Sequence, residues 1–142
     1  MQNKVIIFFS LFFISFLTFS QTFTGNNLNT AFGGENGTPS TITSSANVNL
    51  TGTIGSGYTI DNVLLNIDHL WVGDVIARLI SPSGTSELVL ISLDDTLDDS
   101  DNFTNTVLQD AGADIDLASA PFTGTFAPSG GTFSSVFNGE NI

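Results

Sequence analysis

The strongest constraint on the fold is a run of alternating apolar and polar residues that turn signals interrupt twice. Val63–Asp68 alternates with a period of two, which sends successive side chains to opposite faces of a β-strand. Strand-like apolar patterns follow in Val75–Ile80 and Glu87–Ile91. Between the first two, Trp71–Asp74 predicts a tight connection whose glycine takes a backbone conformation that other residues resist, and Ser81–Gly84 predicts a type I turn. We therefore expect three consecutive antiparallel strands.

No stretch of a dozen residues shows a helical period of 3.6, which predicts an all-β protein. The cluster Gly55-Ser56-Gly57 predicts a turn, and the Ala-rich stretch that holds Asp110, Asp114 and Asp116 predicts a connection. Further short strands are expected where β-branched and aromatic residues gather, namely at Thr41 to Thr43, Val48 to Ile54, Phe103 to Leu108, and within Ala118 to Pro128 and Thr132 to Val136.

Residues 1–20 differ from the rest of the chain. Lys4 gives a short positive region, and Val5–Phe19 is an apolar run broken only by hydroxyl residues. This run is shorter than the roughly 20 residues that a bilayer span needs. We interpret residues 1–20 as a secretory signal peptide cleaved near Ser20, which predicts a secreted or cell-surface protein with no membrane span after cleavage. Residues 21–40 then form a polar lead-in, and residues 41–142 form one domain.

The charge balance excludes one class of partner. Fourteen acidic residues face only Lys4 and Arg78, and there is no cysteine. Nucleic-acid binding is therefore not expected, since it requires clustered cations. Without disulfides, the domain must rely on its core or on bound ions. Acidic surfaces also keep secreted proteins soluble, which is the simpler interpretation of the charge.

A dense acidic loop is the best candidate for a bound ion. Calcium prefers six to eight oxygen ligands from carboxylates, carbonyls and amides. A solvated acidic loop remains the alternative to a calcium site, because the spacing does not match an EF-hand. The residues that could supply the calcium ligands are Asp94, Asp95, Asp98, Asp99, Asp101 and Asn102.

Gly84-Thr85-Ser86 resembles the setting of a serine nucleophile, and Asp68, His69 and Asp74 lie nearby in the sequence. The serine is followed by a strand-like segment rather than a helix, and adjacent residues on a strand point to opposite faces. We therefore expect no catalytic triad and no enzymatic activity in this chain. A hydrogen-bonded structural role is expected for His69.

Two groups of residues carry a resemblance to a known family. The sequence from Thr41 onwards resembles the P domain, also called Homo B, that follows the subtilisin-like catalytic domain of kexin, furin and many bacterial secreted proteases. A later group, Pro121–Pro128 and Phe137–Asn141, is similar to the bacterial branch. The first group comprises Asp68, His69, Trp71, Gly73, Asp74, Ser81, Pro82, Gly84 and Thr85.

The resemblance implies an antiparallel β jelly roll, a kind of β-sandwich, and a non-catalytic module that supports a subtilisin-like protease. Members of this family continue beyond the position of Ile142, so we expect the closing C-terminal strands of the jelly roll to be missing. Only about 40 residues precede the first strands, too few for a catalytic domain. Any protease partner is thus expected downstream or in another chain. The alternative is a stand-alone β-sandwich module for adhesion or ligand binding, with calcium as a stabiliser.

Overall fold

The computed structural model describes residues 19–26, 39–93 and 101–142. Contacts divide the chain into two units, residues 1–47 and residues 48–142. In the first unit the described residues form neither helix nor strand. There, the Asn26 amide donates to the Ser45 carbonyl over 3.1 Å, and Asn26 Oδ1 accepts from the Ser45 amide. Nearly all of the expected signal peptide lies outside the described residues.

The second unit consists mainly of strands, which confirms the all-β prediction. No helix within the described ranges has the length and apolar character needed to cross a membrane. In chain order, the elements are β1 (Val63–Ile67), η2 (Val72–Asp74), β2 (Ile76–Ile80), β3 (Glu87–Ser92), β4 (Phe103–Ala113), η4 (Ile115–Leu117), β5 (Gly124–Phe126) and α1 (Phe133–Phe137).

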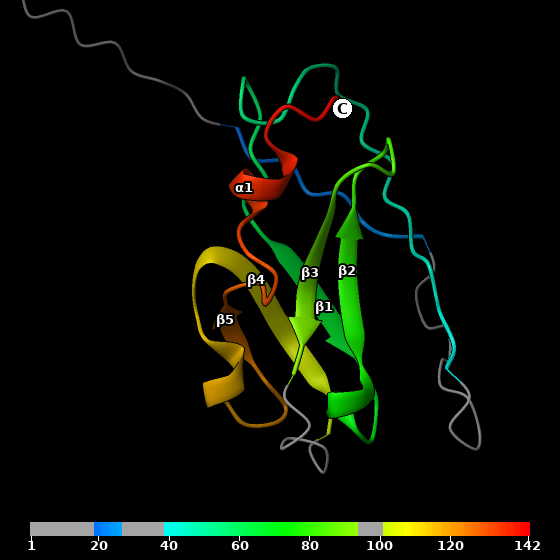
Figure 1. Cartoon of the computed structure of the whole chain (residues 1–142), viewed down its shortest axis with the longest axis vertical. Coiled ribbons are helices and arrows are strands. Elements are labelled where there is room, and N and C mark those ends of the chain that lie inside the picture. The colour runs from blue at the N-terminus through cyan, green and yellow to red at the C-terminus, as the bar shows by residue number, and fades with distance from the viewer. Residues whose placement is uncertain (1–18, 27–38, 94–100) are drawn as a thin grey trace, which may run out of the picture. The chain divides into compact units, whose positions relative to one another are not determined.

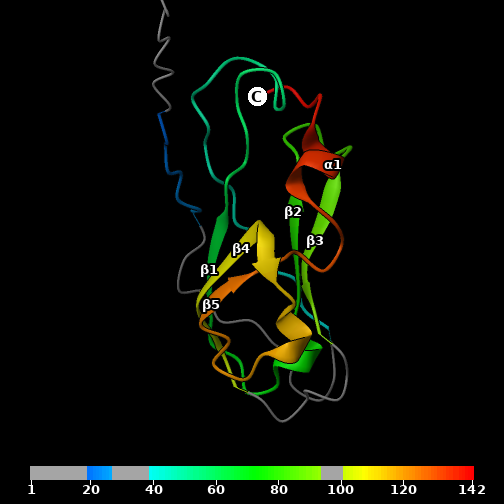
Figure 2. The same ribbon diagram turned by 90° about the vertical axis from the view of Figure 1, so that its left-hand side faces the viewer.

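The strands form two sheets (Figures 1 and 2). One has the order β1-β4-β5, with β1 antiparallel and β5 parallel to β4. The other is the antiparallel pair β2-β3. Both sheets contribute to the core, through Leu88 and Leu90 of β3 and through Leu108 of β4.

The expected pairing of the first two strands is wrong. Residues Val63–Ile67 form β1 as predicted, but β1 pairs with β4 and β2 pairs with β3. Between them, η2 takes the place of the predicted tight turn, and Gly73 does not have a positive φ. Val72 and Val75 are 0% and 4% exposed. Burial of these two valines therefore accounts for a connection that crosses between sheets instead of closing a hairpin.

The second hairpin is confirmed. Ile80 pairs with Glu87, and the Ser81 amide donates to the Ser86 carbonyl over 2.9 Å. Within the turn, the Gly84 amide donates to the Ser81 carbonyl over 2.9 Å, as a β-turn over four residues requires. Gly84 has a φ of 74°, a conformation that glycine adopts without steric cost.

Strand β4 is longer than the sequence predicts. The expected strand to Leu108 continues to Ala113, so the predicted connection around Asp110 is strand. Ala113 pairs with β5, and a Cβ added at Gly112 would lie 2.1 Å from the carbonyl carbon of Phe126. The close backbone approach explains both the glycine and the extension of the strand. Conversely, the strands expected within residues 41–54 are absent there apart from isolated bridges at Thr53 and Ile54.

The expected strand at Thr132–Val136 is instead helix α1. The Thr132 side chain accepts a hydrogen bond from the Ser135 amide, and the Ser135 side chain accepts one from the Thr132 amide, which forms a capping box. Phe133 and Phe137 are 2% and 1% exposed, so one face of this single turn belongs to the core. Burial at a spacing of four residues outweighs the β-propensity of the segment.

Aromatic side chains fill much of the core. Phe103 at the start of β4 and Phe122 before β5 have ring centroids 5.2 Å apart. Beside them, Thr106 is fully buried, and its hydroxyl donates to the Phe122 carbonyl over 2.8 Å. This bond satisfies a buried polar group that would otherwise be costly.

Candidate functional site

The β2-β3 turn, Ser81–Ser86, carries a chain of hydroxyl groups. Ser83 Oγ lies 2.9 Å from Ser81 Oγ and 2.7 Å from Thr85 Oγ1. The Ser86 amide donates to Ser81 Oγ, and the Thr85 amide donates to Ser83 Oγ. Short polar side chains that bond to their own backbone are typical of tight turns, so the turn is held by its own sequence.

The segment Asn138–Ile142, which follows α1, meets this turn. Its backbone bridges to residues 52–54: the Ile54 amide donates to the Glu140 carbonyl, the Gly139 amide to the Ile54 carbonyl, and the Ile142 amide to the Gly52 carbonyl, each over 2.9 Å. Thr53 and Asn141 form an antiparallel bridge. The backbone pairing fixes the position of the segment and directs the Glu140 side chain toward the turn.

Glu140 is the focus of this cluster. Its Oε2 accepts from Ser83 Oγ over 2.9 Å, and its Oε1 accepts from Thr85 Oγ1 over 3.1 Å and also from Ser86 Oγ. Hydrogen bonds from the hydroxyls of Ser86 and Ser83 lower the pKa of Glu140 from its ordinary value of 4.5, because they favour the ionised form more than desolvation disfavours it. We call these four residues the Glu140 cluster.

The structure thus brings together two motif segments that are far apart in the sequence. Ser81, Pro82, Gly84 and Thr85 belong to the turn, and Glu140 lies in the later motif. Neither Glu140 nor Ser83 is recognisable as a site residue from the sequence alone. The signal was present in the Phe137–Asn141 motif, but sequence alone gave no indication of what its glutamate contacts.

The remaining motif residues precede β2 in the chain, and they lie at the end of this five-residue strand that is opposite to the Ser81–Ser86 turn (Figure 1). They are Asp68, His69, Trp71, Gly73 and Asp74. His69 Nδ1 lies 2.7 Å from the Trp71 carbonyl oxygen and 3.1 Å from the Trp71 amide nitrogen. The His69 amide donates to Asn102 Oδ1, and the Asn102 amide donates to the His69 carbonyl. These contacts hold Asn102, the last residue of the acidic loop, in place. Asp68 and Asp74 are exposed beside them.

Ser86 and His69 are too far apart to act together. At about 3.3 Å per residue, the five residues of β2 alone span about 16 Å. The partner of Ser86 Oγ is the Glu140 carboxylate, and the ring of His69 bonds to Trp71. The geometry of a Ser-His-Asp triad requires direct hydrogen bonds between its members.

Most of the candidate calcium ligands lie outside the described residues, namely Asp94, Asp95, Asp98 and Asp99. Of the other two, Asp101 is exposed, and Asn102 Oδ1 accepts from the His69 amide. Across residues 19–26, 39–93 and 101–142, no group of three or more acidic or histidine side chains is placed to hold a metal ion. The calcium prediction for this loop therefore rests mainly on residues outside the described ranges.

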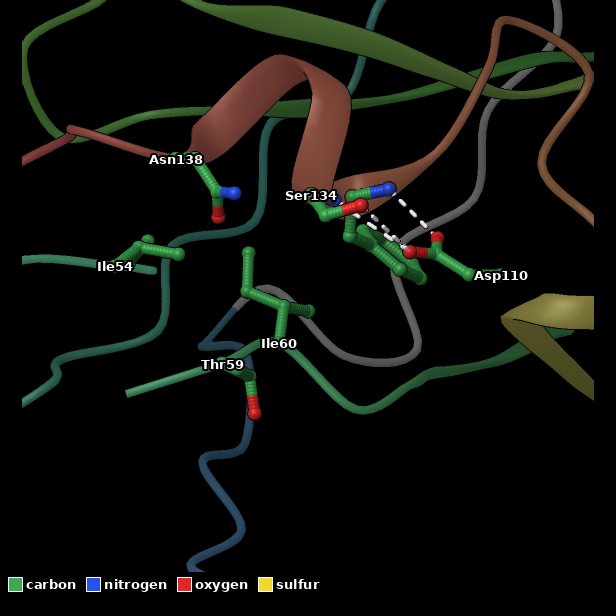
Figure 3. Close-up of a pocket in the computed structure, with 7 residues that line it drawn as sticks. Ile54, Thr59, Ile60, Asp110, Ser134 and Asn138 are labelled. Carbon is green, nitrogen blue, oxygen red and sulfur yellow. Dashed lines mark hydrogen bonds between the residues drawn. The ribbon is translucent and has the colours of Figure 1, made fainter. Parts of the chain in front are cut away.

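A small cavity lies beneath α1 (Figure 3). Asp110 of β4 closes one side, where its Oδ1 accepts from the Phe133 amide over 2.6 Å and its Oδ2 from Ser134 Oγ over 3.4 Å. The cavity volume of about 110 Å³ has room for a few waters, whereas ligand pockets measure about 300–1,000 Å³. The lining residues are Ile54, Thr59, Ile60, Asp110, Phe133, Ser134 and Asn138.

No family model matches the chain, and no curated protein or solved structure is significantly similar to it. The class that the fold defines is an all-β module, and within the described residues the Glu140 cluster joins two distant segments by side-chain hydrogen bonds.

Proposed function

We propose that this chain is a non-catalytic P-domain (Homo B) module of a secreted or cell-surface protein, with a jelly-roll or β-sandwich fold. Its role is to stabilise or assist a subtilisin-like serine endopeptidase, in another chain or in a following domain. The supporting observation is the contact between the two motif segments through Glu140. Residues 81–85 and 137–141 resemble the family independently. Because the two segments contact each other, a single structural role, the Glu140 hydrogen bonds, accounts for both motifs.

A role in binding rather than catalysis fits the surface of the module. Leu70 and Trp71 are 70% and 56% exposed and adjacent in the chain. Tryptophan is enriched among the residues that contribute most to binding at protein interfaces. The excess of acidic residues disfavours nucleic acid as a partner and is compatible with an extracellular location.

The proposal is tested with the secreted subtilisin-like catalytic domains of the same organism. Each is mixed with residues 21–142, and we expect the thermal midpoint of at least one catalytic domain to rise in a concentration-dependent manner. Trp71→Ala should reduce this rise, while Leu117→Ala, a substitution of another exposed apolar residue, serves as the matched control.

Two outcomes contradict the proposal. If no catalytic domain gains stability, the stand-alone adhesion or ligand-binding module becomes the better account. If residues 21–142 cleave a peptide substrate by themselves and Ser86→Ala abolishes the cleavage, the module is an enzyme.

A further inference from the structure

Glu140 connects three parts of the second unit. Its carbonyl accepts from Ile54, its amide donates to the Phe137 carbonyl at the end of α1 over 3.0 Å, and its carboxylate accepts from the β2-β3 turn. The turn belongs to one sheet, whereas residues 52–54 lead into β1 of the other. Glu140 thus ties the turn, through its side chain, to residues 52–54, through its backbone carbonyl.

We propose that Glu140 is an acid-sensitive clasp: the ionised carboxylate joins the β2-β3 turn to the segment Asn138–Ile142, and protonation releases the turn. The inference goes beyond the proposed function and does not depend on it. It concerns local opening at one end of the module rather than global unfolding.

The hydrogen bonds of the Glu140 carboxylate explain why the clasp is sensitive to acid. An ionised carboxylate only accepts hydrogen bonds, and here it accepts from the hydroxyls of Ser83, Thr85 and Ser86. On protonation, one oxygen becomes a donor and keeps only part of its acceptor capacity, so the hydroxyl that faces it reorients or bonds more weakly. The remaining bonds also lose the assistance of the charge, which roughly doubles the strength of such bonds.

The direction of the pH effect follows from linkage. Because the hydroxyl donors lower the pKa of Glu140 in the folded state below 4.5, the folded state binds this proton less readily than the unfolded state. The clasp therefore contributes its full stabilisation above about pH 4.5 and loses it as the pH falls through the lower folded-state pKa.

No other titratable group in the described contacts competes for the hydroxyls. The turn Ser81–Ser86, the residues 52–55 and helix α1 contain no Asp, Glu, His, Lys, Arg or Tyr. Glu87 follows the turn, but its Oε1 lies 2.8 Å from Arg78 Nη1. Tyr58 packs against Gly52 with its ring, and Asp110 accepts from the first turn of α1.

The experiment is amide hydrogen exchange on residues 21–142, expressed as protection factors so that the intrinsic pH dependence is removed. For the wild type, we expect Ile54, Gly139 and Ile142 to lose protection several-fold between pH 7 and about pH 3, while the amides of β4 lose less. Glu140→Gln should show the reduced protection already at pH 7, with little further loss in acid. The control is Glu87→Gln, which replaces a glutamate of the same hairpin that bonds to Arg78. This variant should retain the wild-type response to pH.

Equal loss of protection in acid at Ile142 and at Leu108 of β4 would overturn the clasp, because it would indicate general acid unfolding. So would a Glu140→Gln variant whose three amides are protected as in the wild type at pH 7. The wild-type comparison needs no variant, so the proposal remains testable even if Glu140→Gln does not fold.

Discussion

Ser83 Oγ lies 2.9 Å from Glu140 Oε2, although 57 positions separate the two residues in the sequence. This contact joins the turn of the only hairpin among the described strands to a segment that pairs with residues 52–54. Two of the segments that resemble a P domain, residues 81–85 and 137–141, therefore meet through Glu140.

Asp110 supplies a second hydrogen-bond acceptor at the start of α1, in addition to the Thr132 cap. Because its carboxylate accepts from the Phe133 amide over 2.6 Å, Asp110→Ala removes an N-terminal partner of the helix. We expect a loss of about 1 kcal/mol in the free energy of unfolding, as for other helix caps. Chemical denaturation measures this loss. Asp116→Ala, an exposed aspartate in η4, is the control and should have a smaller effect; equal losses would argue against the capping role.

Thr106 tests the buried hydrogen bond beside the aromatic core. Thr106→Val keeps the shape of the side chain but leaves the Phe122 carbonyl without its hydroxyl donor. We expect the free energy of unfolding to fall by about 1–3 kcal/mol, the cost of an unsatisfied buried group. The exposed Thr104→Val is the matched control on the same strand and should leave stability nearly unchanged. A Thr106→Val variant as stable as the wild type would show that this hydrogen bond makes no net contribution to the free energy of unfolding.

Gly112 tests the close approach of β4 and β5. An alanine Cβ there would lie 2.1 Å from the carbonyl carbon of Phe126, and the backbone atoms involved cannot rotate away. Gly112→Ala should therefore destabilise the protein by about 1–3 kcal/mol, as overpacking does. The exposed neighbour Ala111→Ser provides the baseline in the same thermal denaturation series. If both variants melt alike, the strands are farther apart than described.

Calcium binding by the loop from Asp94 to Asn102 stays a prediction from the sequence. A site with a Kd of about 10⁻⁴ M would add about 1.4 kcal/mol at about 1 mM calcium, a rise of several degrees in Tm. Magnesium at matched ionic strength should give a much smaller rise, since screening alone is weak. A calcium response that survives the double substitution Asp99→Asn and Asp101→Asn would exclude the loop as its origin.

The local elements were largely predictable, because strand alternation and turn chemistry depend on neighbours in the sequence. β1, β3 and the Ser81–Gly84 turn follow from such patterns. Strand partners depend on tertiary burial instead: the valines of the connection enter the core, and this sends β1 to β4 rather than to β2.

Two further predictions, the strand at Thr132–Val136 and the end of β4, were wrong because tertiary contacts outweigh local sequence preferences there. Helix α1 has only five residues, too few for a visible period, and one of its caps comes from Asp110, 23 positions away. The end of β4 contains Asp, Gly and Ala, which have low β-propensity, yet pairing with β5 extends the strand to Ala113. For the candidate site, the motif predicted both segments but not their contact.

The central claim, that Glu140 joins the two motif segments, is tested most directly by NMR on residues 21–142 at neutral pH. We predict nuclear Overhauser effects between the side-chain protons of Glu140 and the β protons of Ser83 and Ser86, which belong to a turn 54 to 57 positions away. Fully assigned spectra that show no such effects, with Glu140 at random-coil chemical shifts, would contradict the account.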